Sequence, residues 1–228
     1  MTAEPQGVPD AGLAADIAAE ATRLGIDLPA AAAAGLARYA ASLWAWNERL
    51  NLTRHTDVGR FVSRDVGDAA AIAEHIAHGE RVLDVGTGGG VPGVILAILR
   101  PDLRVELCDS VAKKARAVAA IVTEAGLTLP VHAAAAQELV ATRPAGGHRF
   151  DSLVVRAVAP LSKLLGWFEP LAGSFGRLLV IKGPRWEEEL AEARDKRLGR
   201  KVAIRRVASW PLRGTENQSV LLEIRATG

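Results

Sequence analysis

The spacing of apolar side chains separates a helical first third of the chain from a mixed remainder. Helical periodicity predicts three helices, over residues 13–24, 29–50 and 57–78. Residues 1–10 contain two prolines and acidic side chains without an amphipathic pattern, and we expect a flexible tail there. The region 11–78 is therefore predicted to be an N-terminal helical extension.

From residue 79 onward, short apolar runs alternate with amphipathic segments. Strands are predicted over residues 81–85, 104–108, 131–133, 150–155, 176–181, 202–208 and 219–225. Helices are predicted over residues 91–99, 113–125, 161–168 and 187–196, and a short one begins at Gln137. Such alternation builds a mostly parallel sheet covered on both faces. Only turn-rich residues join the last two strands, so we expect them to be antiparallel neighbours. The fold class is α/β, with one domain over residues 79–228.

Composition narrows the classes of protein and partner. The chain is 49% hydrophobic and 24% charged, with a net charge of +2 and a pI near 8.9; this balance permits a nucleic-acid partner without requiring one. The single cysteine, Cys108, excludes an internal disulfide and a cysteine-based metal site. The histidines lack metal-ligand spacing, so we expect no metal. Without a long apolar run or a signal peptide, we expect no membrane association and a cytoplasmic location.

A glycine run follows the first predicted strand and opens the next helix. Residues 84–90 read Asp-Val-Gly-Thr-Gly-Gly-Gly. Glycines adopt positive φ and let a ligand approach the backbone, and the helix start supplies N–H donors. The run matches neither the dinucleotide pattern nor the Walker pattern. An acid before the glycines is typical of methyltransferase loops.

A second acid, Asp109, ends the second predicted strand. In nucleotide-binding α/β folds a carboxylate at this position accepts hydrogen bonds from ribose hydroxyls. The alternative is that Asp109 caps the following helix. Ligands of open α/β sheets bind beyond the carboxyl ends of the strands, so we expect Gly86, Asp109 and the Ala136–Gln137 turn to share one site.

The chain resembles the RsmG (GidB) family, bacterial methyltransferases of guanine N7 in 16S ribosomal RNA. The resemblance runs from about Leu43 to the C-terminus. Five motifs carry it: Trp46-Asn47-x-x-x-Asn51-Leu52-Thr53, Leu83-Asp84-Val85-Gly86-Thr87-Gly88-Gly89-Gly90-Val91-Pro92-Gly93, Asp109-Ser110-x-x-Lys113-Lys114, Val155-Arg156-Ala157-Val158-Ala159-Pro160-Leu161 and Lys182-Gly183-Pro184.

The resemblance implies a Rossmann-like class I methyltransferase sheet, mostly parallel with an antiparallel last strand, that binds S-adenosyl-L-methionine. The predicted cofactor contacts are Gly86, Gly88, Val91, Asp109, Ala136, Gln137 and Arg156. The chain departs from the family at three positions. Gln137 replaces a more usual acid, and Asp65 and Ala69 replace a usual histidine and serine.

The acceptor chemistry implied by the resemblance requires little of the protein. Guanine N7 has a lone pair and no proton to lose, so no general base is expected, and Arg156 is only a candidate orienting residue. Methylation of cytosine C5 needs a cysteine nucleophile, a role for which Cys108 at the end of a buried strand is poorly placed. The Asn/Asp-Pro-Pro-aromatic turn common in amine methyltransferases is absent after the fourth strand, where Val155-Arg156-Ala157-Val158 stands.

The predicted partner is 16S ribosomal RNA or the small ribosomal subunit, bound by a monomer. The candidate RNA-binding residues are Arg64, Lys182, Arg185 and Arg205, and Trp186 is the candidate exposed tryptophan for base stacking. Two alternatives remain at this point. One is a methyltransferase of the same fold acting on protein or a small molecule; the other is a noncatalytic RNA-binding factor with a degenerate cofactor pocket.

Overall fold

The computed structural model describes residues 11–141, 149–211 and 217–227. This part of the chain forms a seven-stranded sheet in the order β3-β2-β1-β4-β5-β7-β6. The strands are β1 (Arg81–Val85), β2 (Arg104–Cys108), β3 (Val131–His132), β4 (Ser152–Arg156), β5 (Arg177–Lys182), β6 (Val202–Pro211) and β7 (Gln218–Ala226). Strands β1 to β5 pair in parallel, whereas β7 is antiparallel to both β5 and β6. The predicted mostly parallel sheet with antiparallel last strands is confirmed.

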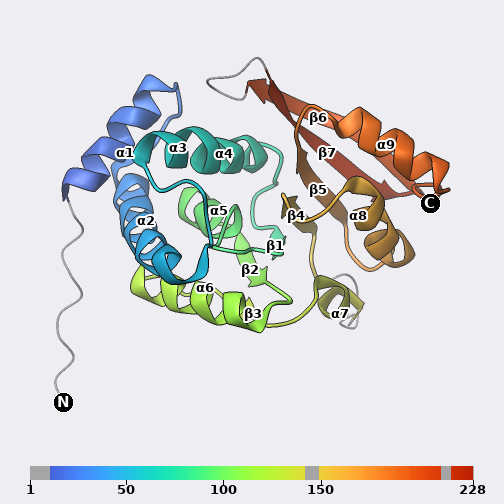
Figure 1. Cartoon of the computed structure of the whole chain (residues 1–228), viewed down its shortest axis with the longest axis horizontal. Coiled ribbons are helices and arrows are strands. Elements are labelled where there is room, and N and C mark those ends of the chain that lie inside the picture. The colour runs from blue at the N-terminus through green and yellow to red at the C-terminus, as the bar shows by residue number, and fades with distance from the viewer. Residues whose placement is uncertain (1–10, 142–148, 212–216, 228) are drawn as a thin grey trace.

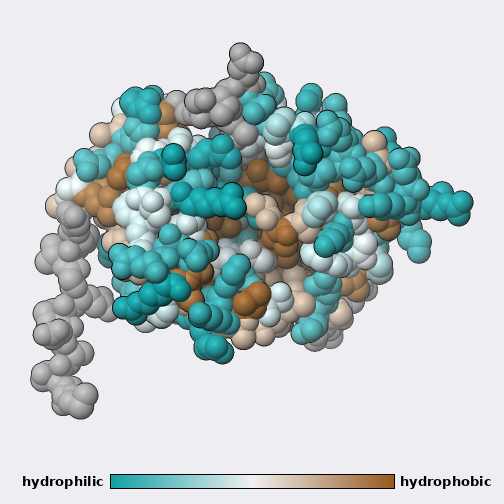
Figure 2. Space-filling model, viewed as in Figure 1, coloured by the Kyte–Doolittle hydropathy of each residue, from teal (hydrophilic) through white to brown (hydrophobic). Residues whose placement is uncertain are grey.

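Helices cover both faces of the sheet (Figure 1). One face carries α1 (Ala11–Arg23), α2 (Ala30–Leu50), α3 (Val58–Arg60), the π-helix η1 (Phe61–Val66), α4 (Gly67–Ala73), α5 (Gly93–Leu99) and α6 (Ala112–Glu124). The other face carries α7 (Ala136–Ala141), α8 (Leu161–Phe168), the short 3₁₀ turn η2 (Glu169–Leu171) and α9 (Trp186–Asp195). Hydrophilic side chains dominate the surface seen in this view, and hydrophobic residues show as small separate groups among them (Figure 2).

Alternation along the strands creates one hydrophobic cluster on each face. In β1, Val82 belongs to the first cluster while Leu83 and Val85 belong to the second, as period-two side-chain direction requires. The first cluster also contains Tyr39 and Leu43 of α2, both fully buried. Burying a large apolar side chain contributes about 1.5–3 kcal/mol. The N-terminal helices and the sheet therefore share one core across the expected boundary at residues 78 and 79.

The third predicted helix differs from the expected continuous segment 57–78. The Asp57 carboxylate accepts the Arg60 N–H at 2.8 Å and starts α3, but residues 61–66 widen into a π-helix. The helix ends at Ala73, five residues before the expected end at residue 78. The cause is tertiary: Arg100 Nη1 donates to the carbonyls of Ala73 and Ile76 and satisfies the helix end.

Two of the other boundary differences lie next to the glycine loop and to Trp210. Helix α5 begins at Gly93 and not at Val91, because turns occupy the intervening residues. Strand β6 reaches Pro211, three residues beyond the expected end, and contains a β-bulge between Arg206 and Ala208. A bulge changes the direction in which later side chains point. Here the bulge precedes Trp210, whose indole then faces α4.

Within residues 11–141, 149–211 and 217–227, no helix combines the length and apolar character that a bilayer span requires. The same residues contain no cluster of three or more histidine, cysteine, aspartate or glutamate side chains suited to a metal ion.

Candidate active site

The glycine loop after β1 adopts a conformation that side chains would obstruct. Gly86 and Gly88 have φ values of +66° and +59°, a region that L-residues rarely enter. A Cβ on Gly86 would lie 2.8 Å from Val158 Cγ2. Helix α2 holds the loop from outside, since the Tyr39 hydroxyl donates to the Gly89 carbonyl at 3.0 Å. The loop is therefore a narrow backbone cradle fixed by the N-terminal helices.

Asp84 anchors both ends of this cradle from beneath. Its Oδ2 accepts the Thr87 hydroxyl at 2.6 Å and the Gly93 N–H at 2.9 Å. The side chain is fully buried, and burial raises the pKa of this carboxyl to about 6. Its Oδ1 is buried without a hydrogen-bond partner among the described residues. The acid that precedes the glycines is thus a structural anchor for the loop.

A cavity of about 650 Å³ opens beside the cradle at the carboxyl ends of β1, β4 and β5. It brings together six of the residues predicted from sequence, namely Gly86, Gly88, Val91, Arg64, Arg156 and Lys182. The segment 51–55, the acids of η1 and α4, and Ser219 of β7 complete much of the wall. This placement matches the rule that open α/β sheets bind ligands beyond the strand ends.

Arg156 ends β4 within a buried charged cluster. Its Nη2 lies 2.6 Å from Asp65 Oδ1, and its Nε lies 3.4 Å from Asp68 Oδ2. Asp68 also accepts the Trp210 Nε1–H at 2.9 Å, and burial raises the pKa of the Asp68 carboxyl. Burial alone would lower the pKa of Arg156, but the two carboxylates outweigh that effect and raise it. Arg156 stays cationic and is held in one orientation.

Several polar atoms around this cluster are buried and have no hydrogen-bond partner in the described part of the chain. They are Arg64 Nε, Asp65 Oδ2 and Arg156 Nη1. Buried polar groups without partners are rare in folded proteins. Two of the three are cationic donors next to the glycine loop, which suits an anionic group of a ligand.

Three of the predicted cofactor residues lie outside the lining of this cavity. Asp109 Oδ2 accepts the Gly88 N–H at 3.1 Å, and its Oδ1 accepts the Val111 N–H at 2.8 Å ahead of α6. Ala136 is buried and Gln137 half-buried where α7 begins. Asp109 therefore fixes the glycine loop to the start of α6, and a carboxylate still retains acceptor capacity for a ribose.

The four candidate RNA-binding residues are not gathered in one place. Arg64 and Lys182 line the cavity, whereas Arg185 and Arg205 are exposed outside its lining. The Lys182 ammonium donates to the Ala159 carbonyl and to Glu189 Oε2, both at 2.7 Å. A contact between Lys182 and a phosphate would compete with Glu189.

The tryptophan chosen for base stacking is not the exposed one. Trp186 is half-buried against the second hydrophobic cluster, because α9 packs its first turn on that face. Trp167 is 38% exposed. The thiol of Cys108 is buried, and burial raises its pKa to about 12, which fits the expectation that it is not a nucleophile.

From the sequence, His55 and Asp68 were assigned no role, and the contact made by Trp210 was not predicted. His55 Nδ1 lies 2.8 Å from Asp65 Oδ1, and Asp68 and Trp210 complete the chain of contacts to Arg156. Asp65 and Asp68 are spaced to share a helix face, which is a weak signal. No sequence pattern indicates the pairings with His55 and Trp210.

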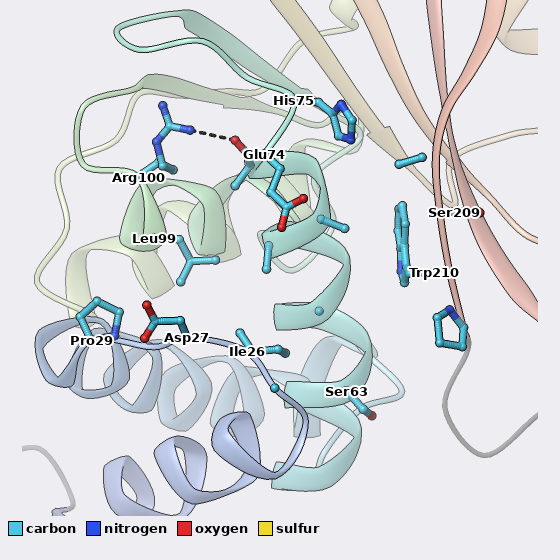
Figure 3. Close-up of a pocket in the computed structure, with 17 residues that line it drawn as sticks. Ile26, Asp27, Pro29, Ser63, Glu74, His75, Leu99, Arg100, Ser209 and Trp210 are labelled. Carbon is cyan, nitrogen blue, oxygen red and sulfur yellow. Dashed lines mark hydrogen bonds between the residues drawn. The ribbon is translucent and has the colours of Figure 1, made fainter.

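A second cavity, of about 580 Å³, lies between α4, the turn before α2 and the end of β6 (Figure 3). Glu74, Asp27 and Trp210 are among its lining residues. None of the predicted cofactor contacts lines it, and neither do Arg64, Lys182, Arg185 and Arg205. Trp210 connects the two cavities, because it lines this one and donates to Asp68 of the other.

Three features together define the class of Rossmann-like methyltransferases. They are a parallel sheet with an antiparallel β7, a glycine cradle anchored by an acid, and a second acid after β2. The comparison with family models matches residues 32–212 to GidB, described as rRNA small subunit methyltransferase G. The chain belongs to this family.

Individual relatives agree with this assignment. The chain is 44% identical to ribosomal RNA small subunit methyltransferase G of Rhodopirellula baltica, over 83% of this chain and 80% of the relative. It is 40% identical to the protein of that name from Sorangium cellulosum, over 81% and 77% of the two chains. A crystal structure of a mutant of MtNAS has a TM-score of 0.56 at 15% identity, covering 96% of this chain and 78% of the other. At that identity the likeness supports the fold alone.

Proposed function

We propose that this protein transfers a methyl group from S-adenosyl-L-methionine to N7 of a guanine in small-subunit ribosomal RNA. The observation that carries the proposal is the glycine cradle beside Arg156. The family of the chain is described as rRNA small subunit methyltransferase G. The proposed partner is the small subunit or its 16S RNA, bound by a monomer in the cytoplasm.

The residues of the cavity fit S-adenosyl-L-methionine. The cradle at Gly86 and Gly88 presents bare backbone, which a Cβ would fill. Arg156 Nη1 is a buried donor without a partner among the described residues, and a guanidinium suits the carboxylate of the methionine moiety. We propose Gly86, Gly88, Val91 and Arg156 as contacts of that half, and Asp109, Ala136 and Gln137 as contacts of the adenosine half.

The residues of the site act by alignment. S-adenosyl-L-methionine, when bound, supplies a methyl group on a sulfonium. Guanine N7 attacks with its own lone pair, so the protein has no proton to remove and its contribution is to hold the acceptor in line. The methylated purine is cationic, and the carboxylates of Asp65 and Asp68 offset the positive charge of Arg156 nearby.

Radiolabelled methyl transfer tests the proposal. Purified protein is offered assembled small subunits, naked 16S RNA and total protein, and the labelled base is identified by chemistry specific for N7-methylguanosine. Label in N7 of a guanine is expected. Label in protein would favour another methyltransferase, and no label with retained RNA binding would favour a noncatalytic factor.

Replacing Asp109 by alanine is expected to weaken S-adenosyl-L-methionine binding by roughly 1–3 kcal/mol, the scale of a lost hydrogen bond to a charged group. The substitution also releases the N–H groups of Gly88 and Val111. Calorimetric titration measures the dissociation constant, and Asp109→Asn is the matched control because it keeps one acceptor oxygen. An unchanged constant in Asp109→Ala would contradict the ribose role.

Replacing Lys182 by alanine is expected to reduce RNA affinity and to lower the salt dependence of log K by about one unit of slope. Cofactor affinity should be unchanged. The control is Glu189→Gln, which breaks the same ion pair but keeps the ammonium. Filter binding over a salt series separates the two variants: equal losses would mean that the pair is structural and that Lys182 does not contact phosphate.

A further inference from the structure

The pair formed by His55 and Asp65 has no role in the cofactor contacts proposed above. His55 Nδ1 lies 2.8 Å from Asp65 Oδ1, the oxygen that also contacts Arg156. The Asp65 side chain is 1% exposed, whereas the His55 side chain is 22% exposed and lines the cavity beside the glycine loop. A buried carboxylate therefore holds one edge of an imidazole that borders the cavity.

The main chain at His55 is also fixed. Its N–H donates to Thr53 Oγ1 at 3.0 Å, and its carbonyl accepts the Trp44 Nε1–H at 2.8 Å. Thr53 in turn donates its N–H to Asn47 Oδ1 at 2.8 Å. The ring is thus held by its backbone and by Asp65 together. A site that selects one ligand requires this kind of support.

The contact with Asp65 determines what the ring offers to a ligand. Because an ionised carboxylate only accepts hydrogen bonds, a neutral ring paired with it carries its proton on Nδ1 and presents Nε2 as an acceptor. Among the described residues, none forms a hydrogen bond with Nε2. The nearby buried atoms without partners include the donors Arg64 Nε and Arg156 Nη1. His55 adds an acceptor to a cavity with cationic donors.

We propose that His55 is a specificity-determining residue that distinguishes guanine from adenine. Its Nε2 accepts a hydrogen bond from N1–H or the 2-amino group of the acceptor base, where adenine has a lone pair and a C–H. Asp65 is the positioning residue that fixes the tautomer of His55. Both purines carry a nucleophilic N7, so the transfer step alone does not select guanine. The inference rests on the proposed function and names a contact within it.

The test compares two RNAs, one with guanosine and one with adenosine at the mapped acceptor position, on each protein. His55→Asn keeps a side-chain N–H that can donate to Asp65 but lacks an acceptor at the Nε2 position. Its methylation rate on the guanosine RNA is expected to fall about 10- to 100-fold, the range for one base-reading contact, with no fall on the adenosine RNA. Asp65→Asn is expected to lower the ratio of the rate on the guanosine RNA to the rate on the adenosine RNA. Its amide can donate to His55 Nδ1 and so shift the ring proton to Nε2.

His132→Asn is the matched control. His132 also contacts a carboxylate, with its Nε2 2.6 Å from Glu106 Oε2, and has a similar exposure of 27% outside the cavity lining. Its guanosine-to-adenosine ratio should equal that of the wild type. Each ratio compares two RNAs on one protein sample, so a partly unfolded variant does not alter it.

The outcomes separate the inference from the proposed function. A wild-type protein that labels no RNA overturns both. If the wild type labels guanosine and the ratio is unchanged in His55→Asn, the inference alone is overturned. The same holds if the wild type shows no preference between the two RNAs. If both rates of the variant fall below detection, its affinities for the two RNAs are compared: a loss confined to the guanosine RNA supports the inference, and equal loss contradicts it.

Discussion

Replacing Gly86 by aspartate is expected to weaken S-adenosyl-L-methionine binding more than about 100-fold. An L-residue at a φ of +66° is strained, by about 1–3 kcal/mol, and this strain moves the loop away from its present conformation. The new Cβ would also lie 2.8 Å from Val158 Cγ2. A carboxylate at this point would repel the cofactor's own carboxylate. Calorimetric titration of the folded variant measures the loss.

Gly25→Asp provides the comparison for this variant. Gly25 has a φ of +69°, and nothing lies within 4 Å of a Cβ built on it. This control therefore introduces the same residue and similar backbone strain far from the glycine loop, between α1 and α2. It should lose stability but keep cofactor affinity. Near-normal binding by Gly86→Asp would show that the backbone at residue 86 does not approach the ligand.

Replacing Asp84 by alanine is expected to lower the free energy of unfolding by about 3 kcal/mol. The Thr87 hydroxyl and the Gly93 N–H both lose their buried acceptor, and a buried donor left without a partner costs about 1–3 kcal/mol. Cofactor affinity should fall as well, because Asp84 holds both ends of the loop. Urea unfolding followed by circular dichroism measures the change, with Asp16→Ala as a control at an exposed position. Stability within about 0.5 kcal/mol of the wild type would contradict the anchoring role.

The raised pKa of Asp84 also predicts a pH dependence with a definite sign. The carboxyl titrates near 3.8 when unfolded and at about 6 when folded, so the folded chain binds the extra proton between these values. The stability that this tighter proton binding contributes is fully present below about pH 3.8. It is lost as the pH rises through about 6, by roughly 3 kcal/mol in total. Asp84→Asn does not ionise and should lack this contribution. A wild-type profile with the same slope between pH 4 and 7 as Asp84→Asn would contradict it.

The sequence predicts the architecture well because the relevant signals are local. Period-two runs place the strands, and their alternation with helices gives the parallel sheet. The exceptions come from contacts between distant residues. Helix α4 ends at Ala73 because Arg100 caps it, and the bulge before Trp210 depends on how β6 lies against β7. Apolar periodicity carries no information about either.

The residues of the site also divide into those with a local sequence signal and those placed by contacts between distant residues. The glycine loop and its acid are contiguous, so their motif predicts the cradle directly. The cluster at Arg156 draws on Asp68 and on Trp210, which lies far along the chain, and no local pattern joins them. Asp65 was recognised only as a departure from a family pattern, and its contact with His55 gives that departure a physical setting. The sequence also left Lys182 as a simple cation, because its pairing with Glu189 appears only in the fold.

Tyr39 donates a hydrogen bond to Gly89, and Asp84 accepts hydrogen bonds from Thr87 and Gly93. These bonds affect the entropy of ligand binding. Ordering the backbone of one residue costs about 1–2 kcal/mol, and glycines lose more freedom than other residues. In this chain that loss accompanies folding, when α2 packs on the sheet. A ligand then meets a loop already in its binding conformation, and Tyr39 of α2 contributes to affinity from outside the cavity lining.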